Sequence, residues 1–499
     1  MELLWSVIPP IGIVLWGALC VTDNLWYDEA YSAALVALPF TKMLYITAVD
    51  AHSPFYYTML KVVYALSGGG THFFVLKIFS LAFMSGYLFL GKYYVRKLFD
   101  REISVWFMIF SILFPIMSVQ AGNVRMYAVA LFFMTLMGLS SFDFYKKPTL
   151  TKWIVFCLAS ICTVYCHTFA MIQAFWFYIL FFVVLLLGKK KELIKGYLIC
   201  GVAVSVAFSP WLFVTARQMM LRMRYDTGSM QEKASLNSIF MYATEWFSAL
   251  ETPIFSVIIM EGLLCLVLLV LGFLYIKKQK EYLPLMGIGA LFLTIMTGFL
   301  ISVFVNNCFL GRYAFPGFGF LMLMLALGMK EIGSLFINRE TTSDEEGRTK
   351  ESVSKETCRK RITFFGSALI CMVALIAFLM QYASEVQLEF DQGRNSFDAF
   401  MAEVKEEDMV LCSFAHTGFL SVYYPDREFY IDGYKPYKMP FENVIQLDSH
   451  SELSKVKGSI WYMHFLDSTP TEFEGYTLVK TGEFHYMYYD FVIYRLFPA

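Results

Sequence analysis

The feature that most constrains this chain is a series of long apolar runs, each about as long as a membrane is thick. A helix of roughly 17–25 apolar residues can cross a bilayer. We identify about eleven such runs, at 2–20, 72–95, 103–120, 124–142, 152–169, 170–188, 196–214, 253–276, 283–304, 313–336 and 362–383. Of the 499 residues, 58% are hydrophobic and only 16% are charged. The pattern predicts a polytopic membrane protein and excludes a cytosolic enzyme, a disordered chain and a secreted disulfide-stapled domain.

Lysine and arginine are distributed unevenly among the connections between these runs. With the N-terminus inside, the cytoplasmic connections carry 21 of them and the outer connections carry 8. Basic residues accumulate in cytoplasmic connections. We therefore expect a cytoplasmic N-terminus and, with an odd number of spans, an extracytoplasmic C-terminus. The net charge of −1 provides no general attraction for nucleic acid, and we expect none as a partner.

The composition changes along the chain and predicts its domains. The expected parts are a transmembrane module at 1–336, a charged cytoplasmic linker at 337–361, a last transmembrane helix at 362–383 and an outer domain at 384–499. The linker is polar and lacks apolar periodicity, which is typical of disorder. The outer domain has β-type runs at 409–412, 428–431, 459–464 and 491–496, and helical spacing at 397–407. We expect a mostly α-helical protein with a small C-terminal extracytoplasmic α/β domain.

The outer loop 21–71 contains two acidic clusters. Asp28 and Glu29 form the first, and Asp50 with His52 forms the second. Apolar residues at 40, 43, 44 and 47 share one helix face, which predicts a short helix on the membrane surface. Two adjacent loop acids are commonly only solvated, but their combination with Asp50 and His52 favours a functional site.

Further polar residues interrupt the apolar runs at ends that are predicted to lie on the outer side. They are Arg125, Tyr127, His167, Arg312 and Tyr313. Ionisable residues at membrane depth are costly and usually serve a site. Each also has an ordinary explanation, since arginine can snorkel to headgroups and a lone histidine is commonly a core residue. Their convergence on one face favours a catalytic chamber there, with the arginine-rich loop 215–252 as a candidate lid.

Several of these residues stand in a familiar order. The patterns are D-E-A-Y at 28–31, D-x-H-x-P at 50–54, V-R-M-Y at 124–127, the outer-end His167 and G-R-Y at 311–313. The sequence resembles the bacterial membrane glycosyltransferases of the GT-C fold, a family 39-like group that includes the protein O-mannosyltransferases and the lipid A aminoarabinose transferase. The resemblance covers about residues 20–320. It implies a polyprenyl-phosphate-linked sugar donor and transfer at the external face, with Asp28 as the base or the acceptor-orienting carboxylate.

One position departs from that resemblance. Many relatives carry an acid shortly before the R-x-Y arginine, and this chain has Asn123 there. Asparagine does not ionise, so a scheme with two carboxylates would need Glu29 or Asp50 as the second.

Transfer of a sugar from a polyprenyl phosphate needs a base for the acceptor hydroxyl and cations for the leaving phosphate. The expected catalytic residues are Asp28 and Glu29. Arginine matches phosphate oxygens, and the expected phosphate-binding residues are Arg125, Arg312 and His52. The expected supporting residues are Asp50, Tyr127, His167 and Tyr313. The sequence has no Gly-rich phosphate loop and no convincing metal-ligand spacing, so we expect no metal ion or other cofactor.

The expected partners are the donor, membrane lipid and an acceptor that is a glycan, a lipid or a protein. The expected location is the cytoplasmic membrane of a bacterium. Two other functions stay open: a transporter or flippase of lipid-linked glycans, and a non-catalytic envelope assembly protein that presents residues 384–499. Transporters usually place charged sites near the bilayer midplane, often in repeated halves. This sequence has no evident repeat, and the absence of an acid at position 123 keeps the assembly protein open as an alternative.

Overall fold

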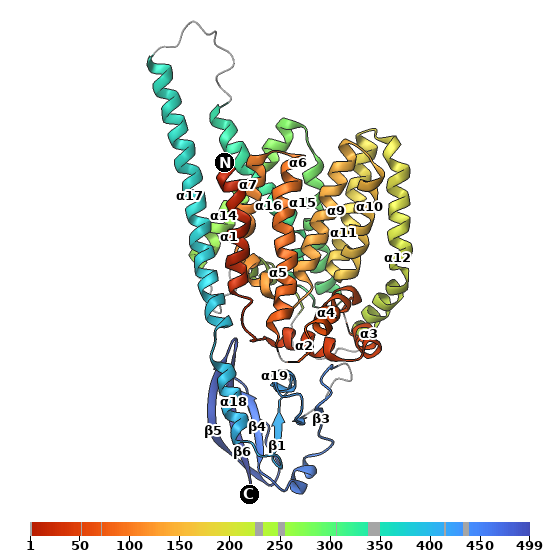
Figure 1. Ribbon diagram of the computed structural model, residues 1–499, viewed down its shortest axis with the longest axis vertical. Coiled ribbons are helices and arrows are strands. Elements are labelled where there is room, and N and C mark those ends of the chain that lie inside the picture. The colour runs from red at the N-terminus through yellow and green to blue at the C-terminus, as the bar shows by residue number, and fades with distance from the viewer. Residues whose placement is uncertain are drawn as a thin grey trace. The chain divides into compact units, whose positions relative to one another are not determined.

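The computed structural model in Figure 1 describes residues 2–50, 52–70, 72–224, 233–247, 255–305, 307–337, 350–413, 416–432 and 439–499. Contacts divide the chain into two compact units. We call the first the helical unit (Met1–Ala18 and Ser80–Ser384) and the second the mixed unit (Leu19–Phe79 and Glu385–Ala499). The three boundaries between them fall at the end of α1 and within two other helices, so α5 (Phe74–Phe89) and α17 (Lys350–Glu389) contribute to both units.

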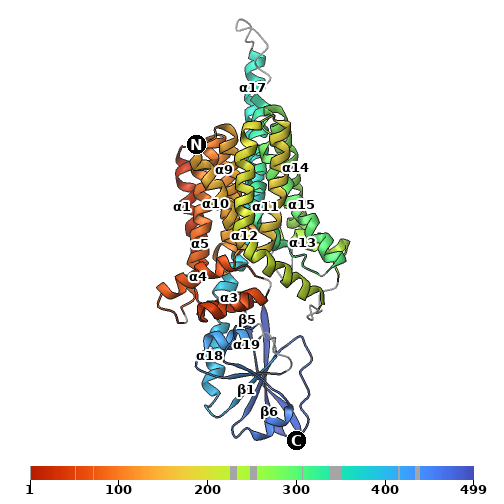
Figure 2. The same cartoon turned by 90° about the vertical axis from the view of Figure 1, so that its right-hand side faces the viewer.

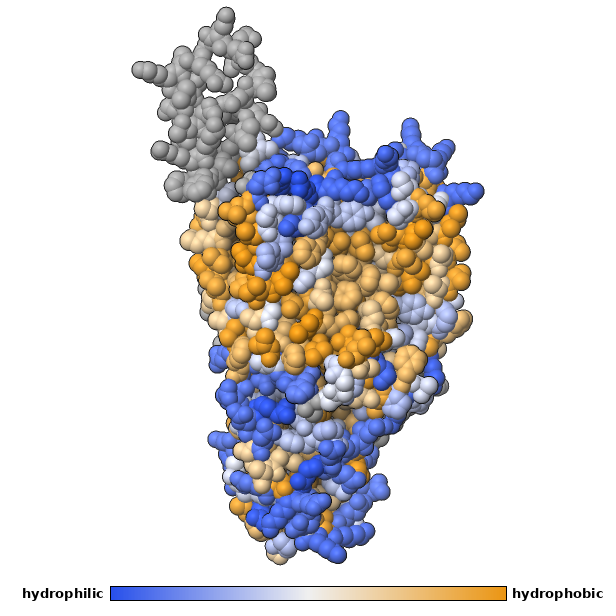
Figure 3. Space-filling view, in the orientation of Figure 1, coloured by the Kyte–Doolittle hydropathy of each residue, from blue (hydrophilic) through white to orange (hydrophobic). Residues whose placement is uncertain are grey.

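The helical unit is built from long apolar helices that run side by side (Figure 1). Besides the shared helices, it contains α1 (Glu2–Ala18), η1 (Leu90–Val95), α6 (Arg96–Leu98), α7 (Arg101–Leu113), α8 (Pro115–Gly122), α9 (Tyr127–Lys146), α10 (Leu150–Cys166), α11 (Thr168–Leu187), α12 (Lys191–Arg224), α13 (Leu236–Phe247), α14 (Phe255–Gln279), α15 (Leu283–Phe304), η2 (Gly311–Gly317) and α16 (Phe318–Ile337). Helices α9 and α16 are buried along most of their length. Most of the other long helices, such as α11, α12 and α14, expose apolar side chains, and apolar residues form a belt on the face shown in Figure 3.

The expected multi-pass membrane protein is confirmed. Among the described residues, eight helices are long and apolar enough to cross a membrane, or nine if the bent pair α7–α8 is one span. Helices α1 and α10 are apolar but shorter, with 17 residues each. Each of the eleven predicted runs coincides with one of these helices. The apolar pattern therefore located the apolar helices, of which eight or nine are long enough to be spans among the described residues.

The run at 103–120 is not the single straight helix that its composition predicts. Its two halves, α7 and α8, meet at an angle of 72°. Pro115 begins α8, and Phe114 before it has extended backbone angles of φ −74° and ψ 121°. Proline disfavours helical geometry in the residue that precedes it, so the helix ends at Leu113 and a new helix starts in another direction.

The predicted linker at 337–361 is helical over part of its length. Helix α17 already begins at Lys350, twelve residues before the span predicted at 362–383. The rest of the predicted linker, 338–349, lies outside the described residues.

The mixed unit contains a six-stranded sheet in the order β3-β2-β1-β4-β6-β5. The strands are β1 (Met409–Cys412), β2 (Phe429–Ile431), β3 (Val444–Gln446), β4 (Ile460–Phe465), β5 (Tyr476–Tyr486) and β6 (Tyr489–Pro498). Strands β1, β2, β3 and β4 pair in parallel, whereas β6 pairs antiparallel with both β4 and β5. Helices α18 (Gly393–Glu403) and α19 (His416–Tyr423) accompany the sheet, as Figure 2 shows. The small C-terminal α/β domain is confirmed.

The first loop contributes three helices to the mixed unit: α2 (Tyr27–Ala37), α3 (Phe40–Val49) and α4 (Pro54–Leu66). The short helix predicted from the apolar spacing is α3, but its predicted apolar face is divided. Met43 and Thr47 are fully buried, whereas Phe40 is 46% exposed. The apolar pattern assigns the loop to the membrane module, yet it groups with residues 385–499. The reason is a set of hydrogen bonds and ring contacts, such as the Tyr27–Phe419 pair with ring centroids 6.4 Å apart.

Phe397 on α18 provides a test of the mixed unit's core. Its ring is fully buried and contacts Tyr486, Phe484 and Phe491 at centroid distances of 5.2, 5.0 and 5.5 Å. Because a buried Phe→Ala change leaves a cavity, Phe397→Ala should lower the free energy of unfolding by about 3–5 kcal/mol. Thermal unfolding of the full chain in lipid nanodiscs measures this. Phe497→Ala, at a half-exposed ring on β6, is the control, and an equal loss in both variants would contradict the assigned core.

Candidate active site

The two adjacent acids of the first loop have different environments. They occupy the first turn of α2, where a carboxylate interacts favourably with the helix dipole. Glu29 is 2% exposed, and its Oε2 accepts the backbone N–H of Trp26 at 3.1 Å. This is the reciprocal half of a capping box, so Glu29 stabilises the start of α2. Asp28 is partly exposed and is the acid of the pair that a substrate can reach.

The second acidic cluster of the loop joins α2 to the start of α4. Asp50 is the residue that caps α3, and His52 lies just before Pro54, the first residue of α4. The Tyr31 hydroxyl donates to Asp50 Oδ2 at 2.7 Å, and His52 Nε2 lies 3.4 Å from the same oxygen. The rings of Tyr31 and His52 are 5.8 Å apart. Asp50 therefore holds Tyr31 of α2 and His52 of the connection before α4 in one cluster, on the loop that carries Asp28.

In the helical unit, Arg125 lies in the short turn between α8 and α9. Its backbone N–H donates to the carbonyl of Asn123 at 2.7 Å, and the Ser80 hydroxyl donates to that carbonyl at the same distance. The Asn123 side chain donates to Gln120 Oε1 at 3.3 Å. Asn123 thus belongs to the turn that presents Arg125, a residue that is 6% exposed.

Three predicted supporting residues of the helical unit meet through their rings. His167 is at the junction of α10 and α11 in extended conformation, with φ −158° and ψ 144°. Its ring lies 5.6 Å from that of Tyr127 and 5.1 Å from that of Tyr313. Phe169 completes the group, 4.8 Å from Tyr313. These aromatic contacts bring together segments that are far apart in the sequence.

The G-R-Y motif forms the start of η2, which packs against α13. The backbone N–H of Arg312 donates to Glu245 Oε2 at 3.2 Å, and Trp246 Nε1 donates to the carbonyl of Gly311 at 3.0 Å. A Cβ atom on Gly311 would lie only 2.5 Å from the carbonyl oxygen of Tyr242. Glycine is therefore needed for this close approach between η2 and α13.

Glu245 is a candidate residue that the sequence motifs do not indicate. It supplies a carboxylate beside Arg312, and burial raises its pKa while the charge of Arg312 lowers it. The sequence gives only a weak indication of Glu245, namely its place in the stretch 215–252 that is predicted as a lid. Of that stretch the structure describes 215–224 and 233–247, and Tyr225, Asp226 and Gly228 lie outside the described residues.

The nine predicted residues fall into two groups. Asp28, Glu29, Asp50 and His52 belong to the mixed unit, whereas Arg125, Tyr127, His167, Arg312 and Tyr313 belong to the helical unit. Acidic groups are thus concentrated in the first group and cationic groups in the second. In the part of the chain that the structure describes, no three His, Cys, Asp or Glu side chains gather as a potential metal site.

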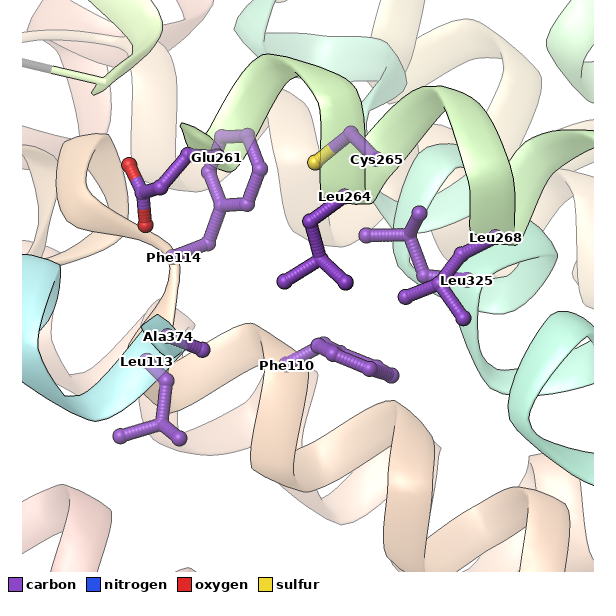
Figure 4. A pocket seen from close by; sticks show the side chains of 9 residues that line it. All are labelled: Phe110, Leu113, Phe114, Glu261, Leu264, Cys265, Leu268, Leu325 and Ala374. Carbon is purple, nitrogen blue, oxygen red and sulfur yellow. The ribbon is translucent and has the colours of Figure 1, made fainter. Parts of the chain in front are cut away.

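A separate pocket of the helical unit contains none of these residues. It is lined mainly by residues of α7, α14, α16 and α17 and is partly open. Its lining residues are Phe110, Leu113, Phe114, Glu261, Leu264, Cys265, Leu268, Leu325 and Ala374. Figure 4 shows the Glu261 carboxyl among the apolar side chains, and its Oε2 has no hydrogen-bond partner among the described residues. The apolar lining suits a hydrocarbon rather than a sugar.

Solved structures share the fold over nearly the whole chain. ArnT from Cupriavidus metallidurans in the apo state has a TM-score of 0.64 and 12% sequence identity, covering 98% of this chain and 97% of that chain. ArnT from the same organism bound to undecaprenyl phosphate has a TM-score of 0.61 and 13% identity, with coverage of 98% and 97%. The archaeal oligosaccharyltransferase AglB from Archaeoglobus fulgidus, in complex with an inhibitory peptide and a dolichol-phosphate, has a TM-score of 0.50 and 10% identity, covering 92% and 69%.

These likenesses show that the chain has the GT-C fold, as the sequence motifs suggested. The sequence itself matches no family model and no curated protein.

The partly buried carboxyl of Glu245 predicts a pH effect on stability. Burial raises the pKa of Glu245 in the folded protein. The contribution of this carboxyl to folding stability is therefore full below its pKa in the unfolded chain, and it is lost as the pH rises through its pKa in the folded protein. Glu245→Gln keeps a hydrogen-bond acceptor but does not ionise. The variant should therefore lose less stability than the wild type as the pH rises from acid to neutral.

Thermal unfolding midpoints of both proteins over that pH range measure the effect. Glu474→Gln, at an exposed position, is the control and should follow the wild-type curve. If the unfolding midpoints of the wild type and Glu245→Gln change with pH in the same way, the raised pKa of Glu245 is contradicted.

Proposed function

We propose that the protein is an integral membrane glycosyltransferase that moves a sugar from a polyprenyl-phosphate donor to an acceptor at the outer face of the membrane. The observation that carries this proposal is the division of charge on a GT-C fold: a carboxylate group around Asp28 and Asp50, and a cationic and aromatic group around Arg125 and Arg312. General base catalysis needs the first, and stabilisation of a leaving phosphate needs the second. The proposed location is the bacterial cytoplasmic membrane, with the N-terminus inside and the C-terminal domain outside.

The solved neighbours support the donor class. An ArnT structure is bound to undecaprenyl phosphate, and an AglB structure contains a dolichol-phosphate and an inhibitory peptide. Both lipids are polyprenyl phosphates, and both proteins share this chain's fold. We extend that ligand class to this chain, and we leave the acceptor as a glycan, a lipid or a protein.

The proposed reaction assigns Asp28 to the acceptor. Its carboxylate takes the proton of the acceptor hydroxyl while that oxygen bonds to the anomeric carbon of the sugar. The bond from the anomeric carbon to the phosphate oxygen breaks, and the electron pair leaves with the polyprenyl phosphate. Asp50 holds the polar side chains of Tyr31 and His52 in place on the same loop as Asp28. Glu29 acts mainly through the cap on α2, with a direct role in catalysis as the alternative.

The proposed donor site uses Arg125 and Arg312, with His52 as an auxiliary. Guanidinium groups pair with phosphate oxygens through two parallel hydrogen bonds, which a lysine does not reproduce. Tyr127, His167 and Tyr313 form the aromatic support described above. Because the sugar is already activated as a phosphate ester, we propose that no metal ion or nucleotide takes part, and chelation with EDTA should leave turnover unchanged.

Replacement of the two first-turn acids separates their roles. Asp28→Asn removes the base and should lower turnover by about 10²–10⁴-fold. Glu29→Gln keeps an acceptor for the Trp26 N–H and should lower turnover far less. The assay gives purified protein polyprenyl-phosphate sugars with candidate acceptors.

Asp426→Asn, at an exposed turn, is the control and should retain wild-type turnover. Full turnover by Asp28→Asn would remove Asp28 from the mechanism. Absence of product with every donor would instead favour a transporter, a flippase or an assembly protein.

Replacement of the arginines tests the donor site. Arg125→Gln and Arg312→Gln each remove a charge-assisted contact worth about 1.5–3 kcal/mol, so affinity for undecaprenyl phosphate should fall about 10–100-fold. Arg125→Lys keeps the charge, so its affinity for undecaprenyl phosphate should lie between that of Arg125→Gln and that of the wild type. Binding is measured on protein in nanodiscs. Arg217→Gln on the exposed end of α12 is the control, and a loss of the same size there would indicate only a general effect of charge.

A further inference from the structure

The segment that leads from α1 to the first-loop acids has no regular structure of its own. Residues 23–26 form neither helix nor strand, yet Asn24 and Leu25 are 7% and 0% exposed. Buried backbone groups need hydrogen-bond partners. Two C-terminal tyrosines and the end of α17 supply them, although they lie hundreds of residues away in the sequence.

The first set of partners is a pair of tyrosines, Tyr423 at the end of α19 and Tyr486 at the end of β5. The backbone N–H of Leu25 lies 2.9 Å from both hydroxyl oxygens. The Tyr486 hydroxyl donates to the carbonyl of Leu25 at 2.8 Å, and the two hydroxyls lie 2.5 Å apart. A phenol has one proton, so a Tyr486 hydroxyl that donates to Leu25 accepts from Tyr423. The Tyr423 hydroxyl has a second acceptor in the carbonyl of Asp23, 3.4 Å away.

Burial raises the pKa of both phenols. Both therefore stay protonated at neutral pH, and the hydrogen-bond pattern is constant over the range in which an enzyme is assayed.

The second set of partners fixes the residues just before Leu25. The Asn24 side chain donates to the carbonyls of Glu389 and Asp391 at 2.9 and 3.0 Å. The Thr22 hydroxyl donates to Glu389 Oε2 at 2.7 Å. That carboxylate also pairs with Lys77 of α5, whose side chain is fully buried. Consecutive residues of the segment are thus attached to the end of α17 and to the tyrosine pair.

The attached segment leads directly into α2. Trp26 is the N-cap and Asp28 lies in the first turn. Helix α2 also contacts α19, and the rings of Tyr27 and Phe419 pack together while Phe419 contacts Tyr486 at 5.3 Å. A hydrogen-bonded helical turn is rigid, so the position of Leu25 determines where the Asp28 carboxylate lies.

We propose that Tyr423 and Tyr486 are positioning residues: the C-terminal domain holds Leu25 through them and thereby sets the place of Asp28 for transfer. The inference rests on the proposed function of Asp28 as the base. It gives the C-terminal domain a part in the reaction besides any recognition of the acceptor. Rates depend steeply on the placement of a reacting group, and a displacement of 1 Å can cost about 10²-fold.

The test compares Tyr423→Phe, Tyr486→Phe and the double variant with Tyr462→Phe in the full chain. Tyr462 is a matched control, because it is also fully buried in this unit and its hydroxyl is bonded to Thr471. The first measurement is amide hydrogen exchange in peptides that cover residues 20–31. The double variant should exchange faster there, and Tyr462→Phe should not.

The second measurement is steady-state kinetics, alone and combined with Asp28→Asn. The double variant should lower kcat about tenfold with both KM values within about twofold. In the Asp28→Asn background it should have almost no further effect, since residues that act through one group are not additive. A purely structural role would lower activity by the same factor in both backgrounds.

Unchanged exchange in the double variant would overturn the proposal, and so would a full additional loss in the Asp28→Asn background. If the wild type makes no product with any donor, the proposed function fails and the positioning role fails with it. The exchange measurement would then still decide whether the tyrosines hold the segment, so the two failures are distinguishable.

Discussion

The constraint on which this structure depends is the lack of water around its apolar runs. In hydrocarbon every backbone N–H and C=O must find a partner within the protein, and the helix is the local way to achieve this. Helices such as α14 and α15 satisfy their own backbone groups and leave almost no polar side chains along their length. Irregular backbone and ionisable groups therefore gather where helices end, and Glu261 inside α14 is an exception.

The candidate site is made from those ends. Asp28 lies in the first turn of α2, Asp50 caps α3, His167 joins α10 to α11, and Arg312 lies in the short η2. Backbone groups at helix ends lack partners within their own helix, and other segments supply these partners. Glu245, for example, accepts the backbone N–H of Arg312. The hydrogen bonds that satisfy the helix ends thus also position the candidate catalytic groups. The same reasoning underlies the proposal that the C-terminal domain positions Asp28.

Much of the architecture could be predicted, and the failures have physical causes. The bend at Pro115 was missed because apolar content says nothing about direction. The sequence does not indicate strand β5, because the exposed Lys480 and Thr481 interrupt its alternation of exposed and less exposed residues, where the pairing with β6 also shifts register. Glu245 was missed because nothing in a single sequence indicates that a helix in a polar stretch packs against the G-R-Y motif. The residues of the two groups could be named in advance, but the Tyr31–Asp50 and His167–Tyr313 contacts could not.

The sequence by itself determined where the helices lie and which polar residues interrupt them. These are local properties, because the hydrophobic effect acts on each run separately and each helix closes its own hydrogen bonds. The tertiary structure alone decided the partners: Glu29 as a cap, Asp50 between Tyr31 and His52, and Leu25 held by Tyr486 from 461 residues away. Such pairs depend on packing between distant segments, and no periodicity in the chain encodes which buried donor will meet which acceptor.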